Sequence, residues 1–250
     1  MKKYRIILLL LGLTIVWQCA QDEPIAIYLI GDSTMADKPL QGNPERGWGQ
    51  ILCEFFNQNV TIYNHAVNGR STKSFIDEGR WQTVYDSLNN GDYVLIQFGH
   101  NDQKEYDSTR YADPHGAYRL NIERFIKESR NKNVIPLLIT PVMRRRFDEN
   151  GQFYDTHGAY PDVVRSVARE MNVPLIDLHR SSRDMIVSEG EEGSKKIFLW
   201  VEPGEFERFP QGKQDNTHFS EYGATIIAGL VVDDIRRLDV NLKRYIIESR

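Results

Sequence analysis

The stretch Ile25-Ala-Ile-Tyr-Leu-Ile-Gly-Asp-Ser-Thr-Met-Ala36 decides how the rest of the chain is interpreted. Its apolar first half has the length of a buried strand, and the Gly-Asp that follows predicts a tight turn presenting Ser33. A serine hydroxyl is too weak an acid to react unaided. A nucleophilic Ser33 therefore requires a base, an orienting acid and oxyanion donors from elsewhere in the chain.

Apolar runs alternate with helical patterns along the following sequence. The predicted strands span 25–30, 60–66, 93–98, 134–140 and 173–178. The predicted helices span 48–57, 80–89, 116–132, 159–171 and 221–238, the last with Ser220 as its N-cap. Short strands with little polar alternation are typical of a parallel sheet buried on both faces. The fold class is therefore predicted as α/β, a three-layer α/β/α sandwich with a five-stranded parallel sheet.

Polar groups follow the first three predicted strands. They are Gly31-Asp-Ser33, Asn68-Gly69 and Gly99-His-Asn-Asp102. In an open parallel sheet the carboxyl ends of the strands share one edge, where ligands bind at the topological switch point. With the flavodoxin-like strand order 2-1-3-4-5, Ser33 is expected between Gly69 and Asn101.

The base and the acid are expected from one segment near the end of the chain, Lys213-Gln-Asp-Asn-Thr-His-Phe-Ser220. His218 can accept the serine proton near neutral pH. Asp215, three residues earlier, can accept the other ring N–H and fix the tautomer. Without its context this spacing is a weak pattern that also occurs in polar surface loops. Together with the other groups it predicts a serine hydrolase.

Four parts of the sequence resemble the four sequence blocks of the SGNH (GDSL-like) hydrolases. They are Gly31-Asp-Ser33, Gly69, Gly99-His-Asn-Asp102 and Asp215-Asn-Thr-His218. Further similarity is to the rhamnogalacturonan acetylesterase subgroup, carbohydrate esterase family 12, through Gly47-Trp-Gly-Gln50, Asn68-Gly-Arg-Ser-Thr72, Gln97-Phe-Gly-His-Asn-Asp102, Thr140-Pro-Val142 and Asp215-Asn-Thr-His-Phe219. The resemblance implies the flavodoxin-like SGNH fold and removal of O-acetyl groups from plant cell-wall polysaccharide. It also implies an oxyanion hole made by the backbone N–H groups of Ser33 and Gly69 and the side-chain amide of Asn101.

Two other functions stay open at this point. One is an esterase of the same fold that acts on acetylxylan or another carbohydrate ester. The other, of a different class, is a non-catalytic carbohydrate-binding surface lipoprotein. The second would be favoured by a missing catalytic residue, and none is missing.

The charge of the chain bears on its partners. The formal net charge is −4, and loss of Lys2, Lys3 and Arg5 with a leader that has no acid before Cys19 makes it −7. This argues against a nucleic-acid partner.

A negative protein acting on a uronate polymer needs local positive charge. The candidate substrate-binding residues are Arg70 and the triplet Arg144, Arg145 and Arg146. Solvated arginines balancing nearby acids are the alternative for the triplet.

The N-terminus is interpreted as an export signal. Residues 1–19 carry basic residues and then an apolar run shorter than the roughly 18 to 20 residues of a spanning helix. Cys19 lies in a lipoprotein-like processing site, so membrane attachment through a lipid on Cys19, in the periplasm or on the cell surface, is a further hypothesis.

Residues 20–250 are predicted as one domain with an elaborated loop around 190–214. Cys53 is predicted to be a buried small apolar residue.

Other chemistry-bearing residues are given structural roles. Ser71 also lies two residues after a glycine, but it is better explained as a hydroxyl that caps the next segment. Gly47-Trp-Gly49 has neither a preceding strand nor a third glycine, so no dinucleotide cofactor is expected. The remaining histidines show no tight metal-ligand spacing, and neither a metal nor another cofactor is predicted.

Overall fold

The structure, a computed structural model, describes residues 23–248. Its centre is a five-stranded sheet of β1 (Ile25–Gly31), β3 (Val60–Asn64), β4 (Tyr93–Gln97), β5 (Ile135–Ile139) and β6 (Leu175–Ile176). The strand order is β3-β1-β4-β5-β6, and each neighbouring pair is parallel. The predicted strand order is confirmed, with β1 flanked by the second and third strands.

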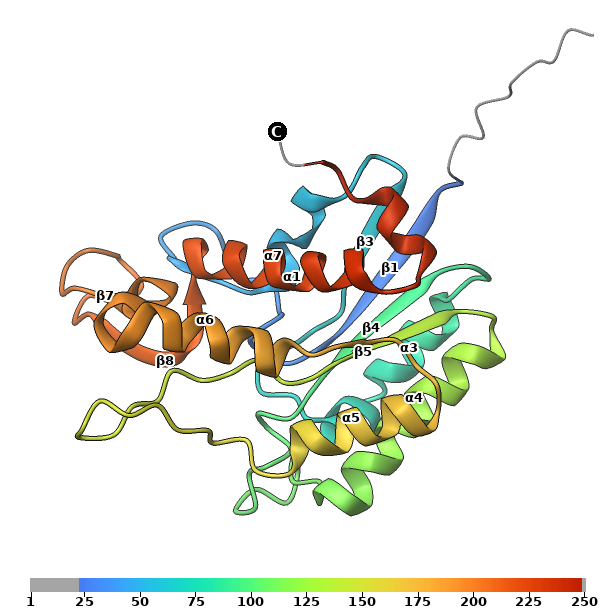
Figure 1. Ribbon diagram of the computed structural model, residues 1–250, viewed down its shortest axis with the longest axis horizontal. Helices are drawn as coiled ribbons and strands as arrows, with labels where there is room; N and C mark the ends of the chain where they lie inside the picture. Colours follow the sequence, from blue (N-terminus) through green and yellow to red (C-terminus); the bar gives the residue numbers. More distant parts are fainter. Residues whose placement is uncertain (1–22, 249–250) are drawn as a thin grey trace, which may run out of the picture.

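Helices cover both faces of this sheet (Figure 1). One face packs against α1 (Trp48–Ile51), α6 (Leu178–Gly193) and α7 (Glu221–Arg237). The other face packs against α2 (Thr72–Asp77), α3 (Arg80–Ser87), α4 (Arg119–Asn131) and α5 (Tyr160–Glu170). Shorter helical turns lie at Leu52–Phe55, Pro114–Tyr118, Ser194–Ile197 and Asn241–Tyr245. The predicted three-layer α/β/α sandwich is confirmed.

Strand β1 shows why the sequence runs continuously apolar. Ile27 and Leu29 are fully buried in the core under α1, α6 and α7. Tyr28 and Ile30 point to the opposite core, under α2 to α5. Because successive side chains of a strand face opposite sides, burial of both faces requires apolar residues at every position.

The helix predicted over 48–57 is shorter than expected. Helix α1 ends at Ile51, and the tighter turn Leu52–Phe55 follows. Leu52 takes the inward position of that turn, which leaves Cys53 exposed. The prediction that Cys53 is buried is therefore wrong. At the other end of the chain, the predicted cap is confirmed, because the Ser220 hydroxyl accepts the Gly223 N–H at 3.0 Å.

The segment before α7, which is not among the predicted strands, is a strand, β8 (Lys213–Ser220). It pairs antiparallel with β2 (Glu45–Arg46) and with β7 (Phe198–Val201) in a second, three-stranded sheet. An elaborated loop is predicted around 190–214. In the structure this region contains the end of α6, a helical turn and β7, and only residues 202–212 lie between β7 and β8. Strand β8 is stabilised by pairing with two neighbouring strands more than by burial. Its sequence is therefore polar and lacks the apolar pattern that predicts a strand.

Within residues 23–248 no helix is long and apolar enough to cross a membrane. The predicted signal at 1–19, with Cys19, lies outside the described residues.

Candidate active site

Ser33 lies in the turn that directly follows β1, at the carboxyl edge of the central sheet. Its neighbour Asp32 is fully buried and holds the turn from inside, since one carboxylate oxygen accepts both the Thr34 N–H at 3.0 Å and the Thr34 hydroxyl at 2.8 Å. Gly31 has no room for a side chain, because a Cβ there would lie 2.7 Å from the Gln97 carbonyl oxygen. The turn is thus fixed by packing and by hydrogen bonds, with the Ser33 side chain half-buried at its tip.

A second hydrogen-bond chain holds this turn against β4. The Gln97 amide donates to the Thr34 hydroxyl at 3.0 Å and accepts the Trp48 indole N–H at 2.7 Å. The other Asp32 oxygen lies 2.9 Å from Nδ1 of the buried His100. Burial raises the pKa of Asp32, but His100 and the Thr34 donors outweigh it and bring that pKa to about 2.

The structure brings Ser33, His218 and Asp215 into one hydrogen-bonded line. His218 Nε2 lies 2.9 Å from Ser33 Oγ, and His218 Nδ1 lies 2.8 Å from Asp215 Oδ2. Asp215 Oδ1 accepts the backbone N–H groups of Thr217 and His218 at 2.8 and 3.0 Å. Burial raises the pKa of Asp215, but the hydrogen bonds and charge of His218 prevail, so that pKa is held well below its usual range. The arrangement can transfer the serine proton to an imidazole oriented by a carboxylate.

Strand β8 carries the base and the acid to Ser33, although it is not part of the central sheet. Phe219 is fully buried opposite Arg46 of β2 and Phe198 of β7, which anchors the end of the strand. Between Asp215 and His218, the Asn216 side-chain oxygen accepts the Trp200 indole N–H and an Arg145 N–H, each at 2.9 Å. These contacts fix the segment that bears the acid and the base.

Gly69 and Asn101 lie in the segments that follow β3 and β4, the two neighbours of β1 in the sheet. Gly69 has φ +76°, a conformation that favours glycine. Asn101 is 3% exposed and uses one amide hydrogen on the Arg70 carbonyl at 3.0 Å, so its second hydrogen is available to a ligand. Within residues 23–248 the backbone N–H groups of Ser33 and Gly69 have no hydrogen-bond acceptor. These donors can stabilise an oxyanion.

Asp102 joins the two loops that carry these donors. One of its oxygens accepts the backbone N–H of Thr72 at 2.8 Å and its hydroxyl at 2.6 Å. The other oxygen is buried without a partner among the described residues. Burial, reinforced by the charge of Asp32, raises the pKa of Asp102 to about 7 against the bonds from Thr72. The predicted cap role of Ser71 is also observed, because its hydroxyl accepts the Ser74 N–H at 3.1 Å.

The four candidate substrate-binding arginines lie in different surroundings. Arg145 is 4% exposed and donates to Asn216 and, at 3.0 Å, to the Ser194 hydroxyl, so it acts as an internal brace. Arg144 is half-buried and donates to the Thr156 hydroxyl at 3.0 Å. Arg146 is exposed. Arg70 pairs with Glu78 at 3.0 Å. The structure therefore does not present the triplet as one cationic surface.

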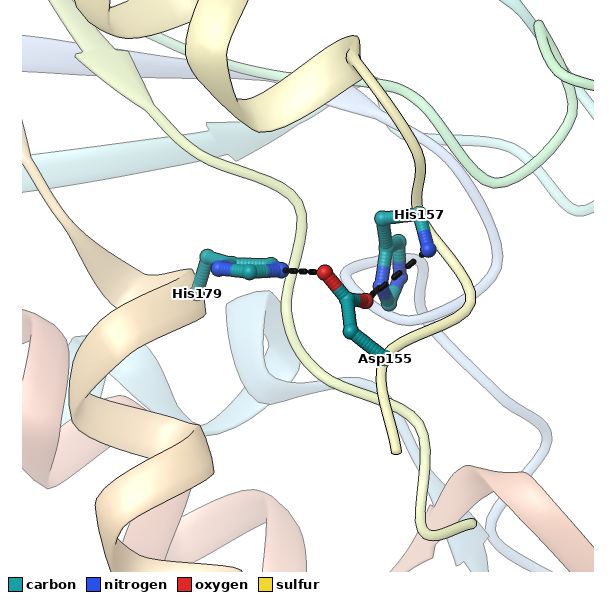
Figure 2. A group of neighbouring side chains, drawn as sticks. All are labelled: Asp155, His157 and His179. Carbon is teal, nitrogen blue, oxygen red and sulfur yellow. Dashed lines mark hydrogen bonds and ion pairs between the residues drawn. The ribbon is translucent and has the colours of Figure 1, made fainter. Parts of the chain in front are cut away.

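Asp155, His157 and His179 form a group that the sequence spacing did not single out (Figure 2). Their potential ligand atoms lie within 4.8 Å of one another. His157 Nδ1 and His179 Nε2 lie 2.8 and 3.0 Å from the two Asp155 oxygens. Arg165 lies 3.2 Å from His179 Nδ1 and can only donate, so the proton of a neutral His179 is on Nε2, facing Asp155. The proton on Nε2 therefore lies where a metal ion shared with Asp155 would have to bind. The three side chains instead link the loop before α5 to the start of α6 by hydrogen bonds.

The sequence interpretation missed two cations next to Asn101 and Gly69, the residues expected to supply oxyanion donors. Lys104 Nζ donates to Asn101 Oδ1 at 2.7 Å. Arg110 lies beside Gly69, with its guanidinium 3.5 Å from the place that a Cβ on Gly69 would take. Lys104 could have been suspected, since it follows Asn101 by three residues, but Arg110 reaches Gly69 only through the fold.

A parallel α/β sheet with a hydrogen-bonded Ser–His–Asp line, its serine at the carboxyl edge, is an arrangement found in serine hydrolases of the α/β class. The sequence profile of the GDSL-like lipase/acylhydrolase family matches residues 29–226. The chain belongs to this family and is a carboxylic ester hydrolase.

Relatives and solved structures agree with this assignment. The chain is 42% identical over 225 residues to rhamnogalacturonan acetylesterase RhgT of Bacillus subtilis, covering 90% of this chain and 95% of that protein. It is 36% identical to probable rhamnogalacturonan acetylesterase YesY of the same organism, over 90% and 98% of the two chains. The crystal structure of Bacillus subtilis YxiM superposes with a TM-score of 0.75 at 24% identity, covering 87% of this chain and 58% of that one. The acetylxylan esterase Axe2 of Geobacillus stearothermophilus superposes with a TM-score of 0.63 at 16% identity, over 91% and 98% of the chains, which shows the shared fold alone.

Proposed function

We propose that this protein is a serine acetylesterase that removes O-acetyl groups from rhamnogalacturonan in plant cell-wall pectin. The observation that carries the chemistry is the line Ser33–His218–Asp215, with 2.9 and 2.8 Å between the bonded atoms. The substrate follows from the 42% identity to a rhamnogalacturonan acetylesterase over nearly the whole length of both chains.

In the proposed reaction, Ser33 attacks the acetyl carbonyl while His218 takes its proton. The oxyanion is held by the N–H groups of Ser33 and Gly69 and the amide of Asn101. The tetrahedral intermediate then collapses with cleavage of the bond between the acetyl carbon and the sugar oxygen, and His218 protonates that oxygen, so that the sugar leaves with a free hydroxyl. A water molecule, deprotonated by His218, hydrolyses the acetyl-enzyme and releases acetate. Asp215 keeps the imidazole in the required tautomer throughout and is not itself protonated.

The test is acetate release from a panel of acetylated rhamnogalacturonan, homogalacturonan and xylan fractions by the wild type and by Ser33→Ala. We expect the wild type to release acetate fastest from rhamnogalacturonan and Ser33→Ala to release none. A preference for acetylxylan would support the alternative esterase function. Binding of the polysaccharide without acetate release by the wild type would favour the non-catalytic lipoprotein.

We propose in addition that the protein is exported and that Cys19 carries a lipid. The basic and apolar residues of 1–19 support this, and so does a 26% identity over 148 residues to a Bacillus subtilis protein named as a lipoprotein, YqeF, covering 52% of this chain and 59% of that protein. Metabolic labelling with a fatty acid should mark the wild type in membrane fractions and leave Cys19→Ala unlabelled. Labelling of neither protein would contradict the lipid.

A further inference from the structure

A cavity of about 440 Å³ opens beside Gly69. Its wall includes the side chains of Arg70, Lys73 and Arg110. Gly69 is therefore shared between this cavity and the donors expected to hold the ester oxyanion. A group that enters the cavity would lie next to an ester whose carbonyl occupies the oxyanion hole.

The guanidinium group of Arg110 lies against Gly69 in this wall. A Cβ on Gly69 would lie 3.5 Å from Arg110 Nη1, 3.6 Å from Cζ and 3.8 Å from Nη2, so the flat face of the guanidinium packs against the glycine. Arg110 pairs with Asp107 through Nε at 3.1 Å. Neither of its Nη groups has a hydrogen-bond partner among residues 23–248, so both are available to a ligand.

The other two cations of the wall are already paired with acids. Lys73 forms an ion pair with Asp77, and Arg70 forms one with Glu78. Both acids also line the cavity, so this part of the wall is close to neutral. It can contact sugar hydroxyls, but it does not add a strong positive field.

On the side of Arg110 the cations outnumber the acids, because Lys104 lies near Arg110 and Arg144 and near the acids Asp107 and Asp32. Burial lowers the pKa of Lys104, and repulsion from Arg110 and Arg144 lowers it further. Cations held this close together repel one another, and a bound anion relieves that repulsion. A positive site beside Gly69 contrasts with the net charge of −4 of the whole chain.

We propose that Arg110 binds the carboxylate of the uronic-acid ring whose acetyl group is being removed. This inference rests on the proposed function and adds the residue that selects an acidic sugar. A hexuronate carries its carboxylate and its acetylated hydroxyl on one rigid ring, so seating the acetyl carbonyl in the oxyanion hole can place the carboxylate at the cavity wall. A guanidinium with two free Nη groups can bind that carboxylate in the bidentate geometry.

The first experiment compares wild type, Arg110→Gln and Arg110→Lys on acetylated rhamnogalacturonan oligomers, on the same oligomers with methyl-esterified carboxylates, and on 4-nitrophenyl acetate. We expect Arg110→Gln to raise KM for the acidic oligomers about tenfold or more. Arg110→Lys should restore part of the loss, because it keeps the charge without the fork. KM for the methyl ester and for 4-nitrophenyl acetate should stay at the wild-type value.

Arg237→Gln is the matched control, since it makes the same change in net charge at an exposed position at the far end of α7. It should leave all three substrates unaffected. If Arg110→Gln affects acidic and neutral substrates equally, or affects neither, Arg110 does not bind the carboxylate.

A second measurement separates this site from the identity of the polymer. Unacetylated galacturonate oligomers are used as competitive inhibitors of 4-nitrophenyl acetate hydrolysis. The inhibition constant should be about tenfold higher for Arg110→Gln than for wild type. If the wild type prefers acetylxylan yet shows this Arg110-dependent inhibition, the proposed polymer is wrong and the carboxylate site stands. If the wild type is not inhibited, the site is refuted.

Discussion

The Lys104 ammonium group donates a hydrogen bond to the side-chain carbonyl of Asn101, with 2.7 Å between Nζ and Oδ1. This bond determines which way the Asn101 amide faces, because an ammonium group can only donate and only the amide oxygen can accept. The amide nitrogen is then left to face the Arg70 carbonyl and the expected oxyanion. The positive charge also polarises the amide and strengthens its N–H donor.

We therefore expect Lys104→Met to lower kcat for 4-nitrophenyl acetate about tenfold with little change in KM, less than the roughly 10²- to 10³-fold expected for Asn101→Ala. Lys104→Arg should recover part of the rate. Because Lys104 acts through Asn101, Lys104→Met should add almost nothing in the Asn101→Ala background. Fully additive effects in this double-mutant cycle would show that Lys104 acts independently of the amide.

Ser33→Ala should abolish acetyl release while leaving the fold unchanged. The Ser33 side chain is half-buried at the tip of a turn whose hydrogen bonds come from Asp32 and Thr34, so its hydroxyl is not needed for the turn. Steady-state kinetics and the thermal midpoint of unfolding are the measurements. Retention of full activity would refute Ser33 as the nucleophile.

Asp215→Asn should lower kcat strongly, on the order of 10⁴-fold if the imidazole takes the wrong tautomer, but less completely than His218→Ala. The side-chain oxygen of the introduced asparagine can still accept the backbone N–H groups of Thr217 and His218, so the strand geometry should persist. Wild-type activity in Asp215→Asn would mean that a different carboxylate orients His218.

Asp102→Asn tests a buried acid through the pH dependence of stability. The pKa of Asp102 is raised by burial to about 7 in the folded protein, above its ordinary value in the unfolded chain. The folded state thus binds a proton that the unfolded state has lost, and this contribution to stability falls as the pH rises from about 4 to about 7. Asparagine does not titrate and can accept the same bonds from Thr72.

The urea midpoints of wild type and Asp102→Asn should therefore be compared at pH 5 and pH 8. We expect the variant to gain stability relative to wild type at pH 8 compared with pH 5. An equal difference at both pH values would show that Asp102 keeps an ordinary pKa in the folded protein.

Arg145→Met and Arg146→Met should differ sharply although they are adjacent. Arg145 is buried and donates to Asn216 and Ser194, so its loss removes hydrogen bonds to a charged group from a buried site and should cost about 2 kcal/mol of unfolding free energy. Arg146 is exposed, and its replacement should change stability by less than about 0.5 kcal/mol. Chemical denaturation measures both, and equal effects would contradict the bracing role of Arg145.

Much of the central fold could be predicted from local patterns. A strand buried on both faces must be apolar at every position, so β1 and β4 are visible as uninterrupted runs. The parallel connections then place the loops after β1, β3 and β4 at one edge of the sheet, and these loops carry Ser33, Gly69 and Asn101. The spacing of Asp215 and His218 likewise predicted the observed hydrogen bond between them, because both lie in one short segment.

Neither helix α6 nor strand β8 is among the elements predicted from the sequence. Strand β8 is polar along most of its length and is held by pairing with β2 and β7, a stabilisation that leaves no apolar alternation in the sequence.

By itself, then, the sequence determined the order of the parallel strands, the turn at Ser33 and the pairing of His218 with Asp215, because these depend on neighbouring residues and on the general geometry of parallel sheets. Only the tertiary structure decided that Arg145 is buried while Arg146 is exposed, and that Arg110 lies beside Gly69. Adjacent arginines are equivalent in any local pattern. Which of them loses its water depends on which distant segments pack against it, and that is a property of the folded chain.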